Sequence, residues 1–414
     1  MRRMKLEDLC ETIVDCPHST PKWESSGVPV IRNFNLKNTV ISLNDPSYVS
    51  EETYAERTKR AIPQKNDIIF SREAPMGVLG IMPDNLKCCL GQRLVLIRPD
   101  SSKISPQYLM YALTSDFVQT QIRRADIAGS IVSNLTLPQI RSLVIPIIED
   151  SEEVANLLGA IDDKIQTNQR ICKELEDTVR LIYDYWFTQF DFPDENGNPY
   201  RSSGGDFSSS HKIKMPSSWN MGQLGDFVRI NSDSVSPSAM PTIVEHYSIP
   251  AFDSMGYPSF DYSSGIKSNK YRVSNNSFLI SKLNPQFKRV WNPLYLTDSP
   301  VCSTEFVVLK CKTTIVDGYV FSILNSERFQ SFMQSNAIAS TGSRSRVEPE
   351  RILEYTLPVP PERVLRKFNE AMQPILKLAN SSRMENHNLA NTRSWLLPML
   401  MTGQVKITES EFGA

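Results

Sequence analysis

The residues of this sequence that could recognise another molecule are cations and amides that follow apolar segments. Ser71-Arg72 and Ser281-Lys282 each come directly after an apolar run that we expect to be a β-strand. Arg and Lys side chains bind phosphates and the guanine edge, whereas Asn and Gln side chains match the adenine edge. Side chains of these types also occur at Arg32, Asn33, Gln92, Arg93 and Asn284. Each alone is more often a solvent-exposed or turn-forming residue, but as a group on equivalent loops they favour contact with DNA.

Two further loops are rich in Gly and Ser and occupy matching places in the two halves of the chain. Small residues leave backbone N–H groups open to a phosphate, and the second loop adds two cations. The candidate residues are Gly129 and Ser130 in the first loop and Gly342, Ser343, Arg344 and Arg346 in the second.

Catalytic motifs are weak or missing. The sequence contains no nucleotide-binding G-x-x-x-x-G-K-[ST] motif and no paired carboxylates with a lysine in a nuclease-like context. Asn292-Pro293-Leu294-Tyr295 is similar to the loop with which adenine methylases hold a flipped base, but it lacks the second proline. No Gly-rich loop follows a strand to hold S-adenosylmethionine. The sequence therefore offers no motif for a catalytic residue or a cofactor in this chain.

Composition narrows the class of protein further. At 414 residues the chain is long enough for two or three domains, and its net charge of -1 means that any DNA-binding surface is a local patch. Seven cysteines without a C-x-x-C spacing and four scattered histidines predict no metal site. With no signal peptide and no apolar run of membrane length, we expect a soluble, cytoplasmic protein with reduced thiols.

A long helix is predicted for residues 151–187. Apolar residues recur there at alternating spacings of three and four for about five heptads, which is typical of a coiled-coil seam. Asn168 is a polar residue within that seam, and such a residue sets the register of a helix pair.

Residues 361–400 can be laid over this first helix at a constant shift. Apolar positions then fall on apolar positions, and Asn168 falls on the polar Ser382. Pro374 departs from the pattern, so we expect a kink or a late start there. We expect the two helices to pair with each other, the alternative being that each packs only on its own globular domain.

The chain contains an internal repeat. The same succession of expected strands and helices occurs in residues 1–149 and 216–360, each followed by a long helix, with a Gly-, Ser- and Pro-rich linker at 191–215. The sequence thus predicts a tandem α/β (α+β) fold: two globular mixed α/β domains and two long antiparallel coiled-coil helices, related by a pseudo-twofold axis. Matched segments are VPVI (28–31) with YSIPAF (247–252), KNDIIFSR (65–72) with NNSFLISK (275–282), and CLGQRLVLIR (89–98) with CSTEFVVLKC (302–311).

With this organisation the sequence resembles the specificity (S) subunit of type I restriction–modification systems. Four segments carry the resemblance, which spans nearly the whole chain: AGSIVSNLTLPQIRSLVIPI, LEDTVRLIYDYWFTQFDFPDENGNPYRSSGG, MPSSWNMGQLGDF and NTRSWLLPMLMTGQVKI. It implies target-recognition domains at 1–149 and 216–360, long helices at 150–190 and 361–402, and a tail at 403–414.

The resemblance implies a non-catalytic subunit that recognises an interrupted, asymmetric DNA site. Two methyltransferase (M) subunits and restriction (R) subunits would be its partners, carrying the S-adenosylmethionine, ATP and Mg that adenine methylation and cleavage require. A system with fused methylase and nuclease, a protein-binding scaffold and an independent methyltransferase stay open as alternatives.

Apolar residues crowd the ends of both long helices. One chain cannot easily bury both clusters, so they are candidates for a subunit interface, the alternative being the foot of an adjacent domain. The candidate interface residues are Tyr183, Trp186, Phe187, Trp395 and Leu396.

Overall fold

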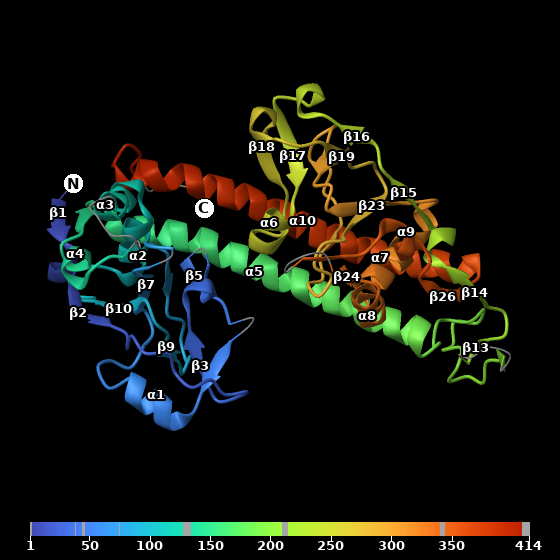
Figure 1. The fold of residues 1–414 in the computed structure, drawn as a ribbon, viewed down its shortest axis with the longest axis horizontal. Helices are drawn as coiled ribbons and strands as arrows, with labels where there is room; N and C mark the ends of the chain where they lie inside the picture. The colour runs from blue at the N-terminus through green and yellow to red at the C-terminus, as the bar shows by residue number, and fades with distance from the viewer. Residues whose placement is uncertain are drawn as a thin grey trace, which may run out of the picture. The chain divides into compact units, whose positions relative to one another are not determined.

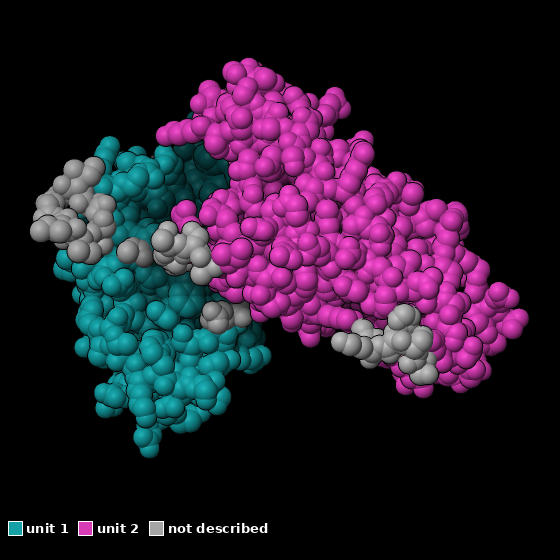
Figure 2. All heavy atoms as spheres, turned by 45° about the vertical axis from the view of Figure 1, so that its right-hand side comes forward, with its two compact units in different colours: residues 1–164, 389–414 teal, residues 165–388 magenta. Residues whose placement is uncertain are grey.

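The computed structural model describes residues 2–37, 39–43, 46–73, 75–126, 134–208, 214–339 and 344–407. The chain forms two compact units, coloured separately in Figure 2. Unit 1 comprises Met1–Lys164 and Leu389–Ala414, and unit 2 comprises Ile165–Asn388. Each unit has its own mixed α/β core and takes part of both long helices.

Unit 1 is built on a six-stranded sheet with the order β2-β10-β7-β8-β5-β4. Strands β2, β10, β7 and β5 are labelled in Figure 1. Its central strands are apolar on both faces. Ile68 and Phe70 point into one hydrophobic cluster, and Ile69 points into another. The period of two along a strand therefore explains the uninterrupted apolar run that the sequence shows. The strand bounds are β2 Cys10–Asp15, β4 Leu36–Lys37, β5 Thr39–Ile41, β7 Ile68–Ser71, β8 Leu79–Ile81 and β10 Leu94–Pro99.

Two smaller sheets complete unit 1. β3 (Val28–Ile31) pairs antiparallel with β6 (Ser47–Val49) and parallel with β9 (Cys89–Leu90). β1 (Arg2–Lys5) pairs with β11 (Val144–Ile147), the strand that leads into the first long helix.

The short helices of unit 1 begin where the sequence places caps. Ser105 accepts a hydrogen bond from the backbone N–H of Tyr108 (3.4 Å), and Pro106 is the first residue of α2, as predicted. Thr136 and Gln139 form a capping box at α4. The helix bounds are α1 Glu51–Arg57, α2 Pro106–Thr114, α3 Asp116–Asp126 and α4 Leu137–Arg141.

Unit 2 contains a four-stranded sheet, β15-β23-β20-β21, and a five-stranded sheet, β16-β19-β22-β17-β18. β14 pairs with β26, β12 with β13, and β24 with β25. The helices are α6 Ile249–Ser254, α7 Asp317–Asn325, α8 Glu327–Ser335 and α9 Pro349–Leu353. The strands are β12 Phe207–Ser208, β13 Met215–Pro216, β14 Asn220–Gln223, β15 Val228–Asn231, β16 Ser234–Val235, β17 Ile243–Tyr247, β18 Ser259–Tyr262, β19 Lys270–Arg272, β20 Ser277–Ser281, β21 Val290–Trp291, β22 Val301–Cys302, β23 Phe306–Cys311, β24 Ile338–Ala339, β25 Ser345–Arg346 and β26 Thr356–Val359.

The two units repeat one topology. The order β2-β10-β7-β8 in unit 1 corresponds to β15-β23-β20-β21 in unit 2, and the parallel pair β3–β9 corresponds to β17–β22. Even a local contact recurs: Ser71 Oγ donates to Glu73 O (2.8 Å), and Ser281 Oγ donates to Leu283 O (3.0 Å). The predicted tandem repeat is confirmed.

Two of the predicted matches between the repeats have the wrong register. The match of residues 89–98 with 302–311 is off by one, because Leu94 lies opposite Ser71 as Phe306 lies opposite Ser281. The match of residues 28–31 with 247–252 is also displaced. The pairing of β3 with β9 and of β17 with β22 makes Ile31 equivalent to Tyr247. The segment that corresponds to residues 28–31 therefore ends at Tyr247, whereas the sequence match began there. The residues after Tyr247 form the short helix α6 instead.

The long helices are α5 (Ser151–Tyr183), which continues as a π-helical turn over Asp184–Thr188, and α10 (Glu362–Met401). α10 is assigned as one helix through Pro374, so the expected late start there is wrong. The helices lie side by side in each unit (Figure 1).

Contacts within each unit show that α5 and α10 run antiparallel. In unit 2 Asn168 Nδ2 donates to Glu385 Oε2 (2.7 Å), and Trp186, further along α5, packs against Phe368, which is earlier on α10. In unit 1 Asp162 pairs with Arg393 at 3.1 Å. The predicted pairing of the helices is confirmed within each unit.

The segment expected to be a linker is partly packed. Phe192, with 2% of its surface exposed, stacks on Tyr200 and on Trp219 in the core of unit 2. The aromatic residues at the start of this segment join the core because β12 and β13 pair to bring the chain back. The prediction of a simple loop is therefore incomplete.

Among the described residues, no helix is both long and apolar enough to cross a membrane.

The helix seam in unit 2 predicts a large effect of one core substitution. Phe368 is 0% exposed and packs against Trp186 and Phe187. We expect Phe368→Ala to lower the free energy of unfolding by about 3–5 kcal/mol, because it leaves a cavity. Leu378→Ala is the matched control on the same helix, since Leu378 is 52% exposed, and it should change stability by no more than about 0.5 kcal/mol. The free energy of unfolding of both variants is measured in urea. Equal losses of stability would contradict the packing of Phe368 between the two helices.

Candidate nucleic-acid interface

Four of the predicted DNA-contact residues meet in unit 1. Arg32, Asn33, Gln92 and Arg93 line one pocket of about 690 Å³. Arg32 and Asn33 follow β3, whereas Gln92 and Arg93 follow β9. Because β3 and β9 are parallel neighbours, their carboxyl ends lie at the same edge, and the two pairs of residues come together there.

The pocket also contains residues that the sequence analysis missed. Trp23, Phe34 and Lys37 line it, and Trp23 and Phe34 are 40% and 48% exposed. Three cations lie around it, and no Asp or Glu is among the described residues of its lining. An aromatic, cationic hollow of this kind suits an anion with flat, apolar faces, such as a nucleic acid. In the sequence, these rings were indicated only by the occurrence of aromatic residues close to Arg32.

Arg32 lies over both of these rings. Its guanidinium carbon is 5.1 Å from the centroid of Trp23 and 4.9 Å from that of Phe34, which is cation–π distance. Nη1 also donates a long hydrogen bond to Ser47 Oγ (3.4 Å).

The amides of the pocket brace its wall. Asn33 Nδ2 donates to Glu73 O (2.7 Å), and Gln92 Nε2 donates to His18 O (2.6 Å). Arg93 has a positive φ of 71° and pairs with Glu73 at 3.1 Å. These contacts fix the loops that present the pocket.

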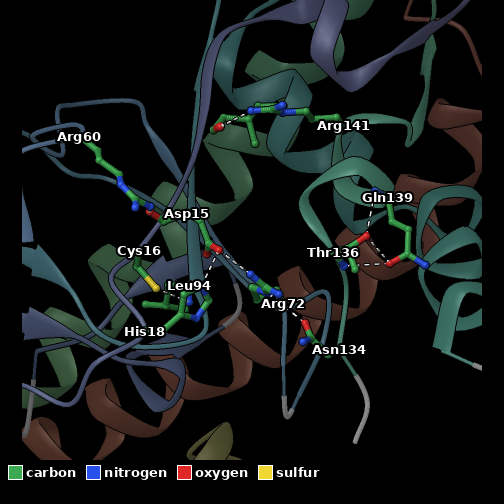
Figure 3. Close-up of polar contacts among 11 residues, drawn as sticks. Asp15, Cys16, His18, Arg60, Arg72, Leu94, Asn134, Thr136, Gln139 and Arg141 are labelled. Carbon is green, nitrogen blue, oxygen red and sulfur yellow. Dashed lines mark hydrogen bonds and ion pairs between the residues drawn. The ribbon is translucent and has the colours of Figure 1, made fainter. Parts of the chain in front are cut away.

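Ser71 and Arg72 lie elsewhere, inside unit 1. Arg72 is 8% exposed; its Nη1 donates to Asp15 Oδ2 (2.6 Å) and its Nε donates to Asn134 Oδ1 (3.0 Å), as Figure 3 shows. His18 Nε2 lies 2.9 Å from the same Asp15 oxygen. The sequence placed Arg72 at a strand end, which is correct, but a buried carboxylate turns its side chain inward. In this structure its guanidinium ties the end of β7 to β2.

Unit 2 presents its predicted residues in a different way. Asn284 has a positive φ of 50°, its N–H donates to Ser345 O (2.8 Å), and its Oδ1 accepts from Ser345 N (3.1 Å). Ser281 is buried and Lys282 is half-buried at the adjacent strand end. Asn284 therefore joins two backbone segments, and it is a turn residue in the free chain.

Arg346 pairs with a carboxylate. Its Nη2 and Nε donate to Glu305 at 2.7 and 3.1 Å, and these hydrogen bonds lower the pKa of Glu305. Arg344 is exposed nearby. Glu305 is the equivalent of Arg93, because Lys282 N donates to Glu305 O as Arg72 N donates to Arg93 O. The two units thus carry opposite charges at one equivalent position.

The remaining predicted loop residues, Gly129, Ser130, Gly342 and Ser343, lie outside the described residues.

The predicted interface residues divide between core and surface. Phe187 is 5% exposed, and Tyr183 and Trp186 pack against the same cluster in unit 2. These three side chains therefore pack against the globular domain next to the helix, which was the alternative to a subunit interface. Trp395 is 59% exposed, whereas Leu396 packs on the core of unit 1.

The segment Asn292-Pro293-Leu294-Tyr295 lines a separate pocket of about 340 Å³ in unit 2. The Tyr295 hydroxyl donates to Ser274 O (3.0 Å) and accepts from Ser277 N (3.1 Å), so it supports a strand end. Asp317 also lines this pocket, and burial raises its pKa to about 6, against hydrogen bonds from Cys311 and Asn276. Among the described residues, no group of three potential metal ligands is found.

Comparison with known proteins shows what the sequence and fold of this chain are similar to. Residues 1–177 match the model of the type I restriction modification DNA specificity domain. The MjaIX specificity subunit of Methanocaldococcus jannaschii is 21% identical over 98% of this chain and 93% of its own length. The HindI specificity subunit of Haemophilus influenzae is 25% identical over 33% of this chain and 30% of its own. The crystal structure of the S subunit from M. genitalium shares the fold, with a TM-score of 0.53 at 13% identity, covering 98% and 96% of the two chains.

The match to the specificity domain covers residues 1–177, which is less than half of the chain, whereas the similarity to a whole specificity subunit covers 98% of it. These comparisons confirm the resemblance to type I restriction–modification specificity subunits that the sequence predicts.

The buried pair in Figure 3 gives a stability prediction. Asp15→Ala leaves the buried guanidinium of Arg72 without its carboxylate, so we expect unfolding to become easier by about 3–5 kcal/mol. Asp116→Ala removes the partner of Arg123 in an exposed pair and should cost less than about 1 kcal/mol. Chemical denaturation gives the free energy of unfolding of both variants. A small loss for Asp15→Ala would show that the buried Arg72 does not need the Asp15 carboxylate as its partner.

Asp317 gives a pH prediction. Its folded pKa of about 6 lies above the ordinary value for Asp, so the folded state holds an extra proton between about pH 4 and 6. Stability from this group is therefore lost as pH rises through that range. We expect Asp317→Asn to gain stability relative to wild type between pH 4 and pH 7, measured by urea unfolding at each pH. Parallel pH profiles would contradict a raised pKa.

Proposed function

We propose that this chain supplies DNA sequence specificity to separate modification and restriction subunits by recognising a bipartite, asymmetric site. The observation that carries the proposal is the repeat of one topology with different side chains at equivalent points. Two related domains can each bind one half of a DNA site, which suits a site made of two separate parts.

The asymmetry of the site follows from the differences between the units. Arg93 in unit 1 corresponds to Glu305 in unit 2. A guanidinium donates hydrogen bonds and a carboxylate accepts them, so the two positions favour different base edges. Readers with different chemistry select different half-sites.

Catalysis would belong to the partners. Two methyltransferase subunits would use S-adenosylmethionine to methylate adenine, and restriction subunits would use ATP and Mg to cleave. The exposed Trp395 on α10 is a candidate contact with such a partner, because large exposed aromatic side chains are enriched in interfaces.

Sequencing that detects methylated adenine tests the proposal directly. The full chain is co-expressed with its methyltransferase subunit in a host that lacks adenine methylation. We expect methylation in one sequence made of two unlike parts with a constant spacing. Methylation without any common sequence, or none with an active partner, would contradict the function, and a symmetric site would contradict the asymmetry.

Arg344 and Arg346 give a quantitative prediction for unit 2. Replacing both with Ala removes two cations from the edge of the predicted loop, so DNA binding by the methyltransferase complex should weaken. The slope of log K against log salt should flatten by up to about 2, if both contact phosphates. The measurement is binding to duplex DNA carrying the mapped site at several salt concentrations.

The matched control is the double variant Arg201→Ala, Arg351→Ala. It removes the same charge and one Arg–Glu pair, since Arg351 pairs with Glu354 at 2.7 Å. Its affinity and salt slope should equal those of wild type. If the Arg344 and Arg346 variant behaves like this control, the loop does not contact DNA.

A further inference from the structure

We propose that Arg32 reads a guanine in the half-site bound by unit 1, and that Trp23 and Phe34 orient its guanidinium for that contact. The inference rests on the proposed function and names the base that this pocket recognises.

The first observation is that Arg32 has hydrogen-bonding capacity left over. A guanidinium has five N–H donors, and the one side-chain hydrogen bond of Arg32 among the described residues is 3.4 Å long, to Ser47. No carboxylate of the described residues pairs with it. The cation is therefore held by ring faces, and most of its donors remain available to a ligand.

Two other arginines that lie over rings, Arg289 and Arg393, differ in this respect. Arg289 also lies over a ring, but its Nε and Nη2 donate to the two carboxylate oxygens of Asp253, each at 2.7 Å. Arg393 lies over Tyr111 and pairs with Asp162 at 3.1 Å. In those two places a carboxylate of the chain pairs with the guanidinium. At Arg32 no carboxylate among the described residues does so, and its donors are open to an acceptor on a ligand.

The second observation is the exposure of the two rings. Trp23 and Phe34 keep 40% and 48% of their surface in water although they lie at a pocket with three cations. Contact with both rings limits the directions that the guanidinium can take, so less conformational entropy is lost when it binds. This is the arrangement needed for a planar ligand edge with two acceptors.

Among DNA groups, guanine presents such an edge in the major groove, where O6 and N7 accept two parallel hydrogen bonds. A phosphate also accepts two, and the repeat separates these cases. The DNA backbone is the same in both half-sites, so a backbone contact should recur in both units.

The equivalent position in unit 2 has no cation. Because Ile31 corresponds to Tyr247, Arg32 corresponds to Ser248, which caps α6 by accepting from Ala251 N (3.1 Å). The residue equivalent to Arg93 is Glu305. The cations at Arg32 and Arg93 are thus particular to unit 1, which favours a contact with a base over a contact with the backbone.

The test uses the full chain with its methyltransferase subunit. The wild-type methylation site is mapped first, and the purified complex then binds duplexes in which each base pair of the site is changed in turn. We expect guanine at one position of one half-site to be preferred. Arg32→Ala should lower that preference about 5- to 150-fold and leave the preferences at all other positions unchanged.

Two more variants separate guanine from phosphate and test the rings. Arg32→Lys keeps the charge but loses the planar pair of donors, so it should lose part of the preference. Phe34→Leu keeps an apolar side chain but removes a ring face, so it should lower the same preference with Arg32 present. The matched control is Arg3→Ala, because Arg3 also lies over an exposed ring, that of Phe117, at 5.1 Å.

The outcomes are distinct. If Arg32→Ala weakens binding to every duplex equally and flattens the salt slope by about 1, Arg32 contacts phosphate and the inference is wrong. If Arg32→Ala and Arg3→Ala both leave binding unchanged, Arg32 makes no contact, although the proposed function stands. If the wild-type complex prefers no sequence, the proposed function itself fails. Equal thermal unfolding midpoints for the variants exclude misfolding as the cause.

Discussion

The packing of α5 against α10 is the constraint on which each unit depends. In unit 2 this seam contains the buried rings of Phe187 and Phe368, and in unit 1 it contains Leu158 and Leu400 within the main core. The polar contact from Asn168 to Glu385 interrupts the apolar seam, and a buried polar residue such as Asn168 disfavours other registers. Because each domain core includes residues of these helices, neither domain is simply attached to them. The strands that precede the helices, β11 and β26, join the same cores.

The parallel pairing of β3 with β9 has the main consequence for recognition in unit 1. It places Arg32 and Arg93 at the same edge of the sheet, although they are 61 residues apart in the sequence. The same pairing in unit 2 places Ser248 and Glu305 at the corresponding edge. One backbone arrangement thus presents different chemistry in the two units. This separates the residues that maintain the fold from those that determine specificity.

Charged side chains in unit 1 have two physical roles. Arg72 is buried against Asp15, and removing one member of such a pair leaves an uncompensated charge. Arg32 is exposed and lies over Trp23 and Phe34, where no carboxylate among the described residues neutralises it. The first arrangement stabilises a strand end, and the second leaves hydrogen-bond donors available to a ligand. Both are arginines near strand ends, so their surroundings alone distinguish them.

The sequence by itself determined the long helices and the repeat, because seam periodicity and the order of elements are properties of the chain that need no knowledge of distant contacts. It also identified Arg32, Asn33, Gln92 and Arg93 as candidates from residue type and from their positions near strand ends. Only the tertiary structure decided that these four meet, because the strand pairing of β3 with β9 brings their loops together. It likewise decided that Arg72 and Phe187 are buried and that Trp23 and Phe34 lie beside Arg32. Those outcomes depend on contacts between side chains far apart in the chain, which local pattern does not contain.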